Sequence, residues 1–168
     1  MSKFNSINPQ DFNTSAFKTI GTDWLLVTAG TTEKSNTMTA SWGGFGILWG
    51  KPVVYLVIRP QRYTKEFVDA NERFSVSVLP NDYRKVLSYL GTVSGRDENK
   101  IEKSGLTLEF DEGVPFFAEA DTYMICRKMA AQPVEPEHFI DPDIDSKWYP
   151  DKDYHTMYIA EIEKLAVK

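Results

Sequence analysis

The clearest pattern in this chain is a series of short apolar segments with the periodicity of β-strands. Residues 74–78 alternate strictly between apolar and hydroxyl-bearing side chains, and residues 106–110 alternate as well. Residues 52–58 are apolar and rich in β-branched side chains, which is typical of a strand buried on both faces. From these patterns we predict strands over residues 24–29, 52–58, 74–78, 106–110, 115–120, 122–130 and 154–165.

Helical patterns are few and short. We predict helices over residues 64–71, between residues 81 and 91, and over residues 97–103. Thr64 would cap the first, Asn81 or Asp82 the second, and Gly91 would end the second. Many strands joined by short helices, without an internal repeat, predict a mainly β fold: one barrel with peripheral helices.

Length and composition suit a single domain over residues 1–168. Of the 168 residues, 42% are hydrophobic, which is enough for a substantial core. No apolar run approaches the ~20 residues needed to span a bilayer, and the first residues lack the apolar centre of a signal peptide. Cys126 is the only cysteine, which excludes an intrachain disulfide and a multi-thiolate metal site. These features predict a cytoplasmic protein that does not bind a membrane.

The net charge of −5 is concentrated in one segment. Residues 131–153 hold seven carboxylates and two lysines, so the rest of the chain has 17 acidic and 17 basic residues. Without a basic excess, nucleic-acid binding is not expected. Four prolines exclude long helices and central strands from the segment, and we predict a long exposed excursion with one short helical turn. Its aspartates do not form an EF-hand, because Ser146 and Lys152 stand where that loop needs glycine and glutamate.

Several common sites are excluded. The glycine-rich run at residues 43–50 has Trp49 where a dinucleotide-binding turn needs glycine, and it does not fit a P-loop. With two histidines and no His-Glu-x-x-His sequence, neither a metal site nor a zinc hydrolase is expected. Cys126 lies in an apolar strand pattern, and we interpret it as a buried structural thiol and not as a nucleophile.

The segment from residue 36 to residue 42 is small, hydroxyl-rich and uncharged. It consists of Asn36, Thr37, Met38, Thr39, Ala40, Ser41 and Trp42. One interpretation is a surface turn that leads into a strand, with Met38 and Trp42 packed inward. The other is a backbone segment that lies close to a flat polar ligand and matches its rim with N–H and C=O groups. The segment alone supports both equally.

Cations and hydroxyl groups follow the apolar segment 52–58. They belong to Arg59, Arg62, Tyr63 and Thr64. One arginine can donate to two phosphate oxygens at once, and a helix start offers free N–H groups. We therefore favour an anion site over a surface turn with incidental cations.

Three further residues are weaker candidates. Ser94 and Lys100 flank a glycine-containing turn into the third predicted helix, where they could extend the same anion site, but a plain helix cap explains them almost as well. His155 enters the last predicted strand after the acidic segment, and by itself it is more typical of a structural histidine than of a catalyst.

Taken in order, these motifs resemble the flavin reductase-like domain family, most closely its flavoredoxin-type branch. The matching sequences are Asn-x-Met-Thr-Ala-Ser-Trp from Asn36, Arg-x-x-Arg-Tyr-Thr from Arg59, Ser-Gly-Arg-Asp from Ser94 with the downstream Lys100 and Gly-Leu-Thr, and His-Thr at His155. The resemblance covers about residues 15–165. It implies a mainly β, FMN-binding split β-barrel with short peripheral helices, and a homodimer with each cofactor near the subunit interface.

The resemblance also implies roles for the candidate residues. Residues 36–42 would line the isoalloxazine ring, and Arg59, Arg62, Tyr63 and Thr64 would hold the ribityl phosphate, assisted by Ser94 and Lys100. His155 would lie where nicotinamide stacks, and it is the one residue to which a catalytic role is given. The family usually has glycine where this chain has Ala160, so this methyl group is expected to narrow the cavity or to alter strand packing.

The implied activity is that of an FMN-dependent oxidoreductase. NAD(P)H would pass hydride to the flavin, and a small-molecule or protein acceptor would take the electrons. Hydride transfer requires no protein acid or base, so a chain poor in histidine and cysteine can perform it. Two alternatives stay open: an FMN-binding electron carrier of the flavoredoxin type with little nicotinamide oxidation of its own, and a barrel for another ligand such as haem. The choice between NADH and NADPH is open as well.

Overall fold

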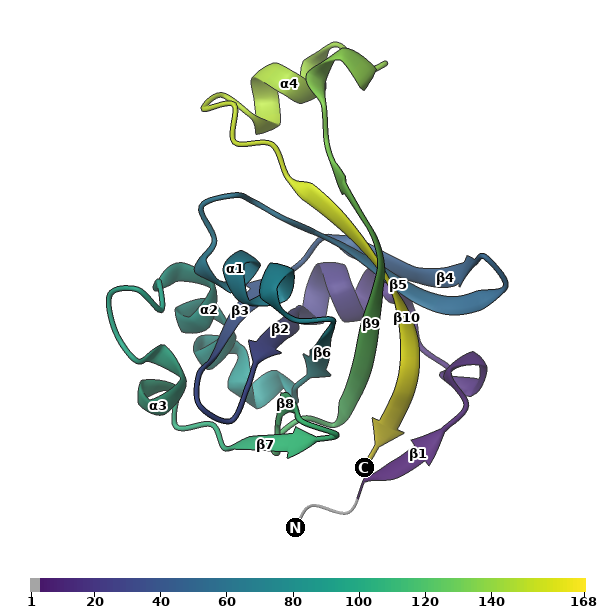
Figure 1. Ribbon diagram of the computed structural model, residues 1–168, viewed down its shortest axis with the longest axis vertical. Helices are drawn as coiled ribbons and strands as arrows, with labels where there is room; N and C mark the ends of the chain where they lie inside the picture. Colours follow the sequence, from purple (N-terminus) through teal and green to yellow (C-terminus); the bar gives the residue numbers. More distant parts are fainter. Residues whose placement is uncertain (1–3) are drawn as a thin grey trace.

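The computed structural model describes residues 4–168 and consists mainly of antiparallel strands with short helices at their sides (Figure 1). The predicted domain start at Met1 lies outside the described residues. The strands are β1 (Asn5–Ile7), β2 (Leu25–Gly30), β3 (Ser35–Ala40), β4 (Gly43–Leu48), β5 (Lys51–Ile58), β6 (Arg73–Val78), β7 (Leu108–Asp111), β8 (Val114–Phe117), β9 (Thr122–Pro133) and β10 (Thr156–Val167). The α-helices are α1 (Tyr63–Ala70), α2 (Arg84–Thr92), α3 (Lys100–Ser104) and α4 (Asp143–Trp148). A π-helix (Phe17–Asp23) and short 3-10 turns at Pro9–Asp11, Asn81–Tyr83 and Pro136–His138 complete the described elements.

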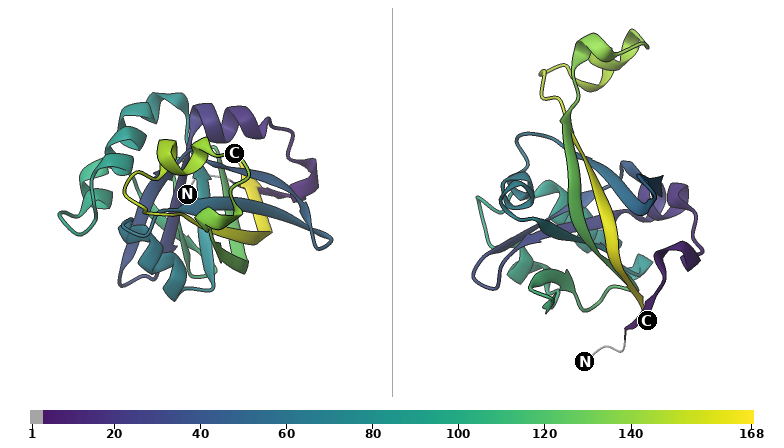
Figure 2. Two further views of the ribbon diagram at one scale, coloured as in Figure 1. Left: turned by 90° about the horizontal axis from the view of Figure 1, so that it is seen from above. Right: turned by 45° about the vertical axis from the view of Figure 1, so that its right-hand side comes forward.

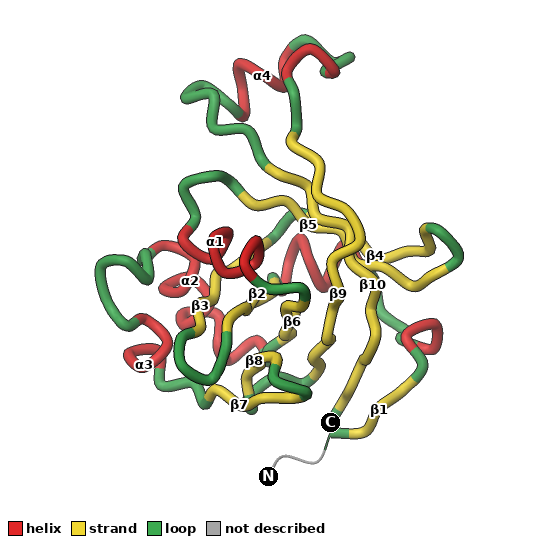
Figure 3. Tube along the Cα trace, viewed as in Figure 1, coloured by secondary structure: helices red, strands yellow, loops and turns green. Residues whose placement is uncertain are grey.

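Eight strands form one sheet in the order β3-β2-β6-β9-β10-β5-β4, with β1 added beside β10. The long strands β9 and β10 shift register twice against each other, which helps them bend around the core (Figure 3). β3 and β4 follow one another in the chain but lie at opposite ends of the strand order, so each has one open edge. β7 and β8 form a separate hairpin. The predicted mainly β, split-barrel architecture is confirmed.

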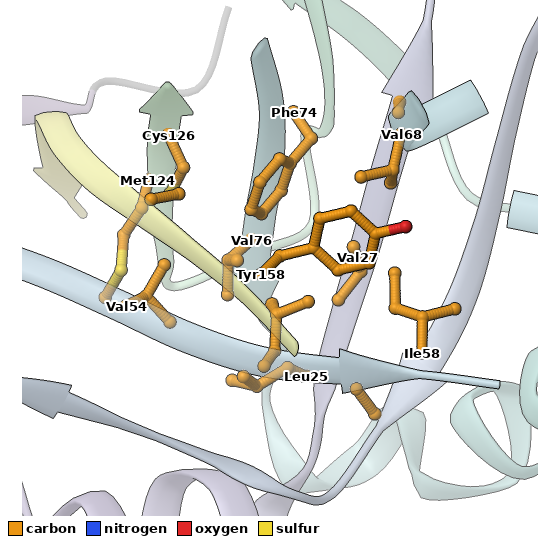
Figure 4. Packing of buried hydrophobic residues seen from close by; sticks show 14 of the residues in the cluster. Leu25, Val27, Val54, Ile58, Val68, Phe74, Val76, Met124, Cys126 and Tyr158 are labelled. Carbon is orange, nitrogen blue, oxygen red and sulfur yellow. The ribbon is translucent and has the colours of Figure 1, made fainter. Parts of the chain in front are cut away.

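The core lies inside the curved sheet, where the apolar faces of the predicted strands meet (Figure 4). Large side chains that are fully buried there include Ile58 of β5, Phe74 of β6 and Tyr158 of β10. Burying side chains of this size stabilises the fold by ~1.5–3 kcal/mol each. Cys126 is buried in the same cluster, and desolvation raises the pKa of its thiol, as expected of a structural cysteine.

The predicted cap of the first helix is wrong. α1 begins at Tyr63, with Arg62 in the cap position, and Thr64 lies inside the first turn. The Thr64 hydroxyl is buried and accepts a hydrogen bond from Nδ2 of Asn36 at 2.9 Å. A contact with β3, distant in sequence, therefore uses the hydroxyl group that local sequence assigns to the cap.

The predicted limits of the second helix are also wrong. Asn81 and Asp82 belong to a 3-10 turn, and α2 runs from Arg84 through Gly91 to Thr92. Gly91 does not end the helix; it allows β3 to approach, since a Cβ there would lie 3.0 Å from Cβ of Thr39. The third helix begins at Lys100, three residues later than predicted, and ends at Ser104 before Gly105, which has the left-handed conformation with φ of 74°.

Strand β4 is missing from the predicted strands because its sequence is rich in glycine. Gly43 has φ of 150°, and a Cβ there would lie 2.3 Å from the carbonyl oxygen of Tyr55. Glycine thus permits the sharp passage from β3 to β4. The preceding segment is itself a strand, β3, followed by Ser41 and Trp42; Met38 is packed inward, whereas Trp42 is 42% exposed.

The acidic segment projects from the barrel and contains a short helix. β9 and β10 extend past the body of the barrel and carry residues 134–155, which we call the arm (Figure 2). The arm contains α4 and one 3-10 turn, and residues 131–133 belong to β9. Among residues 4–168, no helix has the length and apolar character needed to cross a membrane.

Candidate functional site

A pocket of about 300 Å³ lies between the end of β3, the end of β5 and the base of the arm. We call it the β3 pocket. Its lining residues are Met38, Thr39, Ala40, Ser41, Trp42, Val57, Arg59, Arg62, Trp148 and His155. Eight of these ten were predicted as site residues. The structure thus brings together the two segments, 36–42 and 59–64, on which the sequence-based hypothesis depends.

The open edge of β3 gives the pocket its polar character. From Ser35 to Ala40, β3 pairs with β2 alone, so half of its backbone N–H and C=O groups point away from the sheet without a partner strand. The strand is held in place by Thr39, whose hydroxyl donates to the carbonyl oxygen of Leu87 in α2 at 2.5 Å. The small side chains Ala40 and Ser41 keep the backbone accessible to a flat ligand.

The half-buried Arg62 and the buried Lys100 are cations that meet at the C-terminal end of α2. Nη1 of Arg62 donates to the carbonyl oxygen of Gly91 at 2.7 Å, and burial lowers the pKa of this guanidinium. Nζ of Lys100 donates to the carbonyl oxygens of Leu90 and Val93, each at 2.8 Å. Burial, together with the charge of Arg62, lowers the pKa of Lys100 to about 8.

These two cations have carbonyl groups as partners and no carboxylate. None of the ion pairs within residues 4–168 includes Arg62 or Lys100. The carbonyl groups at the end of a helix carry partial negative charge and stabilise nearby cations. They do not neutralise two full charges, so an anion bound here would be stabilised by both.

Arg59 differs from Arg62 because it has a carboxylate partner. Its Nη1 lies 2.7 Å from Oδ1 of Asp153, and its Nη2 donates to the carbonyl oxygen of Trp148 at 2.9 Å. Both partners belong to the arm. Arg59 therefore lines the pocket while it binds the arm, a role that the sequence did not indicate.

The other predicted residues lie beside the β3 pocket and do not line it. Asn36, Tyr63 and Lys100 line a second pocket of about 570 Å³ between the β2–β3 turn, α1 and α3. Thr37 and Thr64 are buried, with Thr37 bonded to the hydroxyl of Thr28 at 2.9 Å. Ser94 lies in the loop between α2 and α3, where its Oγ accepts from the backbone N–H of Arg96 at 3.2 Å.

His155 is 7% exposed and lies against the aromatic residues of the pocket. Its ring centroid is 5.3 Å from that of Trp42, and its Nδ1 is 2.7 Å from the hydroxyl oxygen of Tyr149. Burial and the charge of Arg59 lower the pKa of His155 to about 4, although Asp153 opposes the shift. The imidazole is therefore neutral at neutral pH.

Sequence reasoning missed Val57, Trp148 and Tyr149. Val57 belongs to a predicted buried strand, so nothing marked it as a pocket residue. Trp148 and Tyr149 form an aromatic pair within an acidic, proline-rich segment, and Tyr149 is buried there. Two adjacent aromatic residues in an otherwise exposed segment could have indicated that the segment packs against another part of the protein.

Ala160 lies in the core and not in the β3 pocket. It is fully buried in β10 within the cluster of Figure 4, beside a register shift between Ile159 and Ala160. Of the two expectations for this methyl group, altered strand packing fits its place, whereas a narrowed β3 pocket does not. Among residues 4–168, no group of three His, Cys, Asp or Glu side chains is arranged to hold a metal ion.

Comparison with protein families identifies this architecture. Residues 17–168 match the model of the flavin reductase like domain. An uncharacterized protein of Archaeoglobus fulgidus is 33% identical over 97 residues, which are 56% of this chain and 54% of that protein. The chain thus spans about half the length of this relative.

Solved structures share the fold at low sequence identity. An FMN-binding domain of a flavin reductases-like enzyme from Shewanella baltica OS155 superimposes with a TM-score of 0.71 and 19% identity, over 99% of this chain and 78% of that one. Flavoredoxin of Desulfovibrio vulgaris (Miyazaki F) superimposes with a TM-score of 0.69 and 21% identity, over 94% of this chain and 75% of that one. An NADH:FAD oxidoreductase of Streptomyces globisporus C-1027, in complex with NAD and FAD fragments, superimposes with a TM-score of 0.65 and 18% identity. The superposition covers 87% of this chain and 74% of that one. These similarities establish the fold.

The burial of His155 predicts a pH-dependent loss of stability. Its pKa is about 4 in the folded chain against an ordinary value of 6.5, so the unfolded state binds the proton more readily. Above pH 6.5 the imidazole is neutral in both states, and the folded state has its full stability. As the pH falls from 6.5 towards 4, the unfolded state takes up the proton and the unfolding free energy falls by up to about 3 kcal/mol. Urea unfolding of wild type and His155→Gln at pH 7 and pH 4.5 measures this contribution.

We expect the unfolding free energy of His155→Gln to fall less between these two pH values than that of wild type. His138→Gln, which removes the exposed histidine of the arm, is the matched control. Equal losses in wild type and His155→Gln would contradict the assignment of a buried neutral imidazole.

Proposed function

Because the chain belongs to the flavin reductase-like domain family, we propose that it is an FMN-binding oxidoreductase, an NAD(P)H-dependent flavin reductase that passes electrons to an acceptor. The observation that carries this proposal is a pair of cations without a carboxylate partner, the half-buried Arg62 and the buried Lys100, next to the uncharged open edge of β3. One end of this site suits a phosphate group, and the other suits a flat polar ring.

The donor set at the cations fits the phosphate group of FMN. A buried cation without a counter-ion is costly, and a bound anion recovers part of that cost. Arg62 keeps guanidinium N–H groups beyond the one that bonds Gly91, and its planar fork suits two phosphate oxygens. α1 begins at Tyr63, so the first N–H groups of this helix add donors with the favourable end of its dipole.

The β3 pocket fits the ring of FMN. The outward N–H and C=O groups of β3 would pair with the polar rim of the ring, with Thr39, Ala40 and Ser41 allowing close approach. Bound FMN would supply the hydride-accepting ring and the chemistry of electron transfer. The residues of the chain would orient that ring and exclude water from it. His155, which is neutral at neutral pH, would offer a hydrogen bond to the nicotinamide donor without adding charge.

A second candidate function is that of an electron carrier with little nicotinamide oxidation of its own. It is favoured by the similarity to flavoredoxin and by the arm, because Trp148 of the arm lines the pocket and takes up space there. A carrier needs no room for nicotinamide beside its flavin.

We also propose that the protein is a homodimer. Exposed apolar side chains gather on the π-helix and on the β4–β5 hairpin, at Phe17, Ile47, Leu48 and Tyr55. An apolar edge of a sheet is a common pairing surface, and exposed apolar patches mark interfaces. Part of this surface adjoins Ser41 and Trp42 of the β3 pocket, which would place the flavin near the second subunit. Sedimentation of the wild type against Ile47→Asp tests this assembly.

Arg62→Ala should lower the affinity for FMN by about 10- to 100-fold, because a charge-assisted hydrogen bond contributes ~1.5–3 kcal/mol to binding. Riboflavin, which lacks the phosphate group, should bind the variant nearly as well as the wild type. Quenching of flavin fluorescence measures both affinities. Arg73→Ala, which breaks an exposed ion pair with Glu163, is the control. Equal weakening of FMN and riboflavin would show that Arg62 does not contact the phosphate.

The lowered pKa of Lys100 predicts that FMN binding takes up a proton. In the free protein this pKa is about 8, and a phosphate nearby would raise it by stabilising the charged form. FMN affinity should therefore be highest below pH 8 and fall between pH 8 and 9 by up to about tenfold per pH unit. Riboflavin affinity is the internal reference, and parallel pH profiles for the two ligands would remove Lys100 from the phosphate site.

Mixing the FMN-loaded protein with NADH or NADPH under anaerobic conditions separates the two functions. A flavin reductase should lose its visible flavin absorbance within the first turnovers, because hydride from the nicotinamide reduces the ring. A carrier should keep its absorbance with both nucleotides and lose it with dithionite. A protein that retains no flavin absorbance after addition of FMN and removal of the unbound FMN would refute both functions.

A further inference from the structure

The arm reaches the β3 pocket through Trp148, a residue outside every motif that led to the proposed function. Trp148 lines the pocket from the arm, and its ring packs edge-to-face on Trp42, with centroids 5.1 Å apart. It is 43% exposed, so part of the indole remains open to a ligand. Trp148 is thus a wall of the pocket that is also accessible from outside.

Arg59 and Gln61 fix the arm beside the pocket. Arg59 binds both the Asp153 carboxylate, at 2.7 Å, and the Trp148 carbonyl oxygen, at 2.9 Å. Nε2 of Gln61 donates to the second carboxylate oxygen of Asp153 at 2.7 Å. Within the arm, the hydroxyl of Tyr149 pairs with Nδ1 of His155 at 2.7 Å. Because Arg59 bonds the carbonyl oxygen of Trp148 and Tyr149 is the next residue, the backbone at Trp148 is held in one place.

The arm is also stiffened from within. Tyr149 stacks on Phe139, with centroids 5.9 Å apart and an interplanar angle of 12°, and it packs on Tyr154 at 4.9 Å. Asp145 accepts from the hydroxyl of Tyr154 at 2.7 Å and pairs with Lys152 at 2.6 Å. A small aromatic cluster and an ion pair thus give the arm a shape of its own, which makes it a defined wall.

The size of the β3 pocket limits what fits beside Trp148. About 300 Å³ is at the lower end of the range for small-molecule sites. A flavin ring in the pocket would use most of that space. A second reactant would then have to approach the ring through the opening that Trp148 borders, and a thin, flat molecule passes such an opening best.

We propose that Trp148 is the specificity-determining residue for the second reactant, which it selects as a planar conjugated ring by stacking on it. This inference rests on the proposed function, because it needs a flavin in the β3 pocket. Trp42 and His155 complete the aromatic surround, and Asp153 acts as a positioning residue through Arg59. Aromatic rings at centroid separations of about 4.5–7 Å attract one another, which is the interaction that Trp148 offers.

The test compares Trp148→Ala, Trp148→Phe and Ile140→Ala in the FMN-loaded protein. Ile140 is an exposed residue of the arm outside the β3 pocket and serves as the matched control. The second reactant is NADH or NADPH, followed by anaerobic flavin reduction over a range of concentrations. Should neither nucleotide reduce the flavin, the second reactant is menadione, a flat quinone, and the reoxidation of dithionite-reduced flavin is followed.

We expect Trp148→Ala to raise the half-saturating concentration of the second reactant by about 3- to 10-fold, as loss of an aromatic contact does. The limiting rate should change by less than about twofold, with each variant saturated with FMN so that a change in flavin affinity does not enter the comparison. Trp148→Phe should restore most of the loss, and Ile140→Ala should have no effect. Asp153→Ala should act in the same direction as Trp148→Ala, because it removes the carboxylate through which Arg59 and Gln61 hold the arm.

The outcomes separate this inference from the proposed function. A wild-type protein that does not bind FMN overturns both. A protein that binds FMN, and whose Trp148→Ala variant keeps the half-saturating concentration of wild type, overturns the role of Trp148 alone. An unchanged Asp153→Ala variant overturns the positioning role of Asp153.

Discussion

The C-terminal end of α2 is the point at which most of the site is held together. Its last carbonyl groups accept hydrogen bonds from Arg62, at the start of α1, and from Lys100, at the start of α3. One helix end thus fixes the starts of two other helices, and it does so with two cations. The same arrangement concentrates positive charge beside the open edge of β3, so the contact that stabilises this part of the fold also creates the anion site that we propose.

The order of strands explains why a pocket exists next to those cations. A closed barrel would pair β3 on both sides and leave no backbone group for a ligand. Here the chain leaves β3 through Ser41 and Trp42 and joins the other end of the sheet at β4, where Gly43 permits a passage too close for a side chain. The open edge is therefore a result of topology, and the small residues beside it keep it accessible.

Sequence patterns predicted those parts of the molecule that depend on local periodicity. The buried strands followed from β-branched and alternating segments, and the projecting arm followed from its prolines and carboxylates. The caps of α1 and α2 were misplaced because Thr64 and Gly91 serve contacts with β3, which no local pattern reports. The segments 36–42 and 59–64 were recognised as parts of one site through family resemblance. The structure brings most of their residues to one pocket.

The role of Arg59 shows most clearly what the sequence could not supply. Two arginines three residues apart look equivalent in an anion-binding motif, yet Asp153, which is 94 positions away, gives one of them a partner. Arg59 is therefore neutralised by the arm, while Arg62 stays without a carboxylate and pairs with the end of α2. Because an anion gains most from the cation whose charge is not yet balanced, we propose that the phosphate binds at Arg62 with Lys100, and that Arg59 serves the arm. Such a division of roles would let the arm shape the opening of the pocket without competing for the proposed ligand.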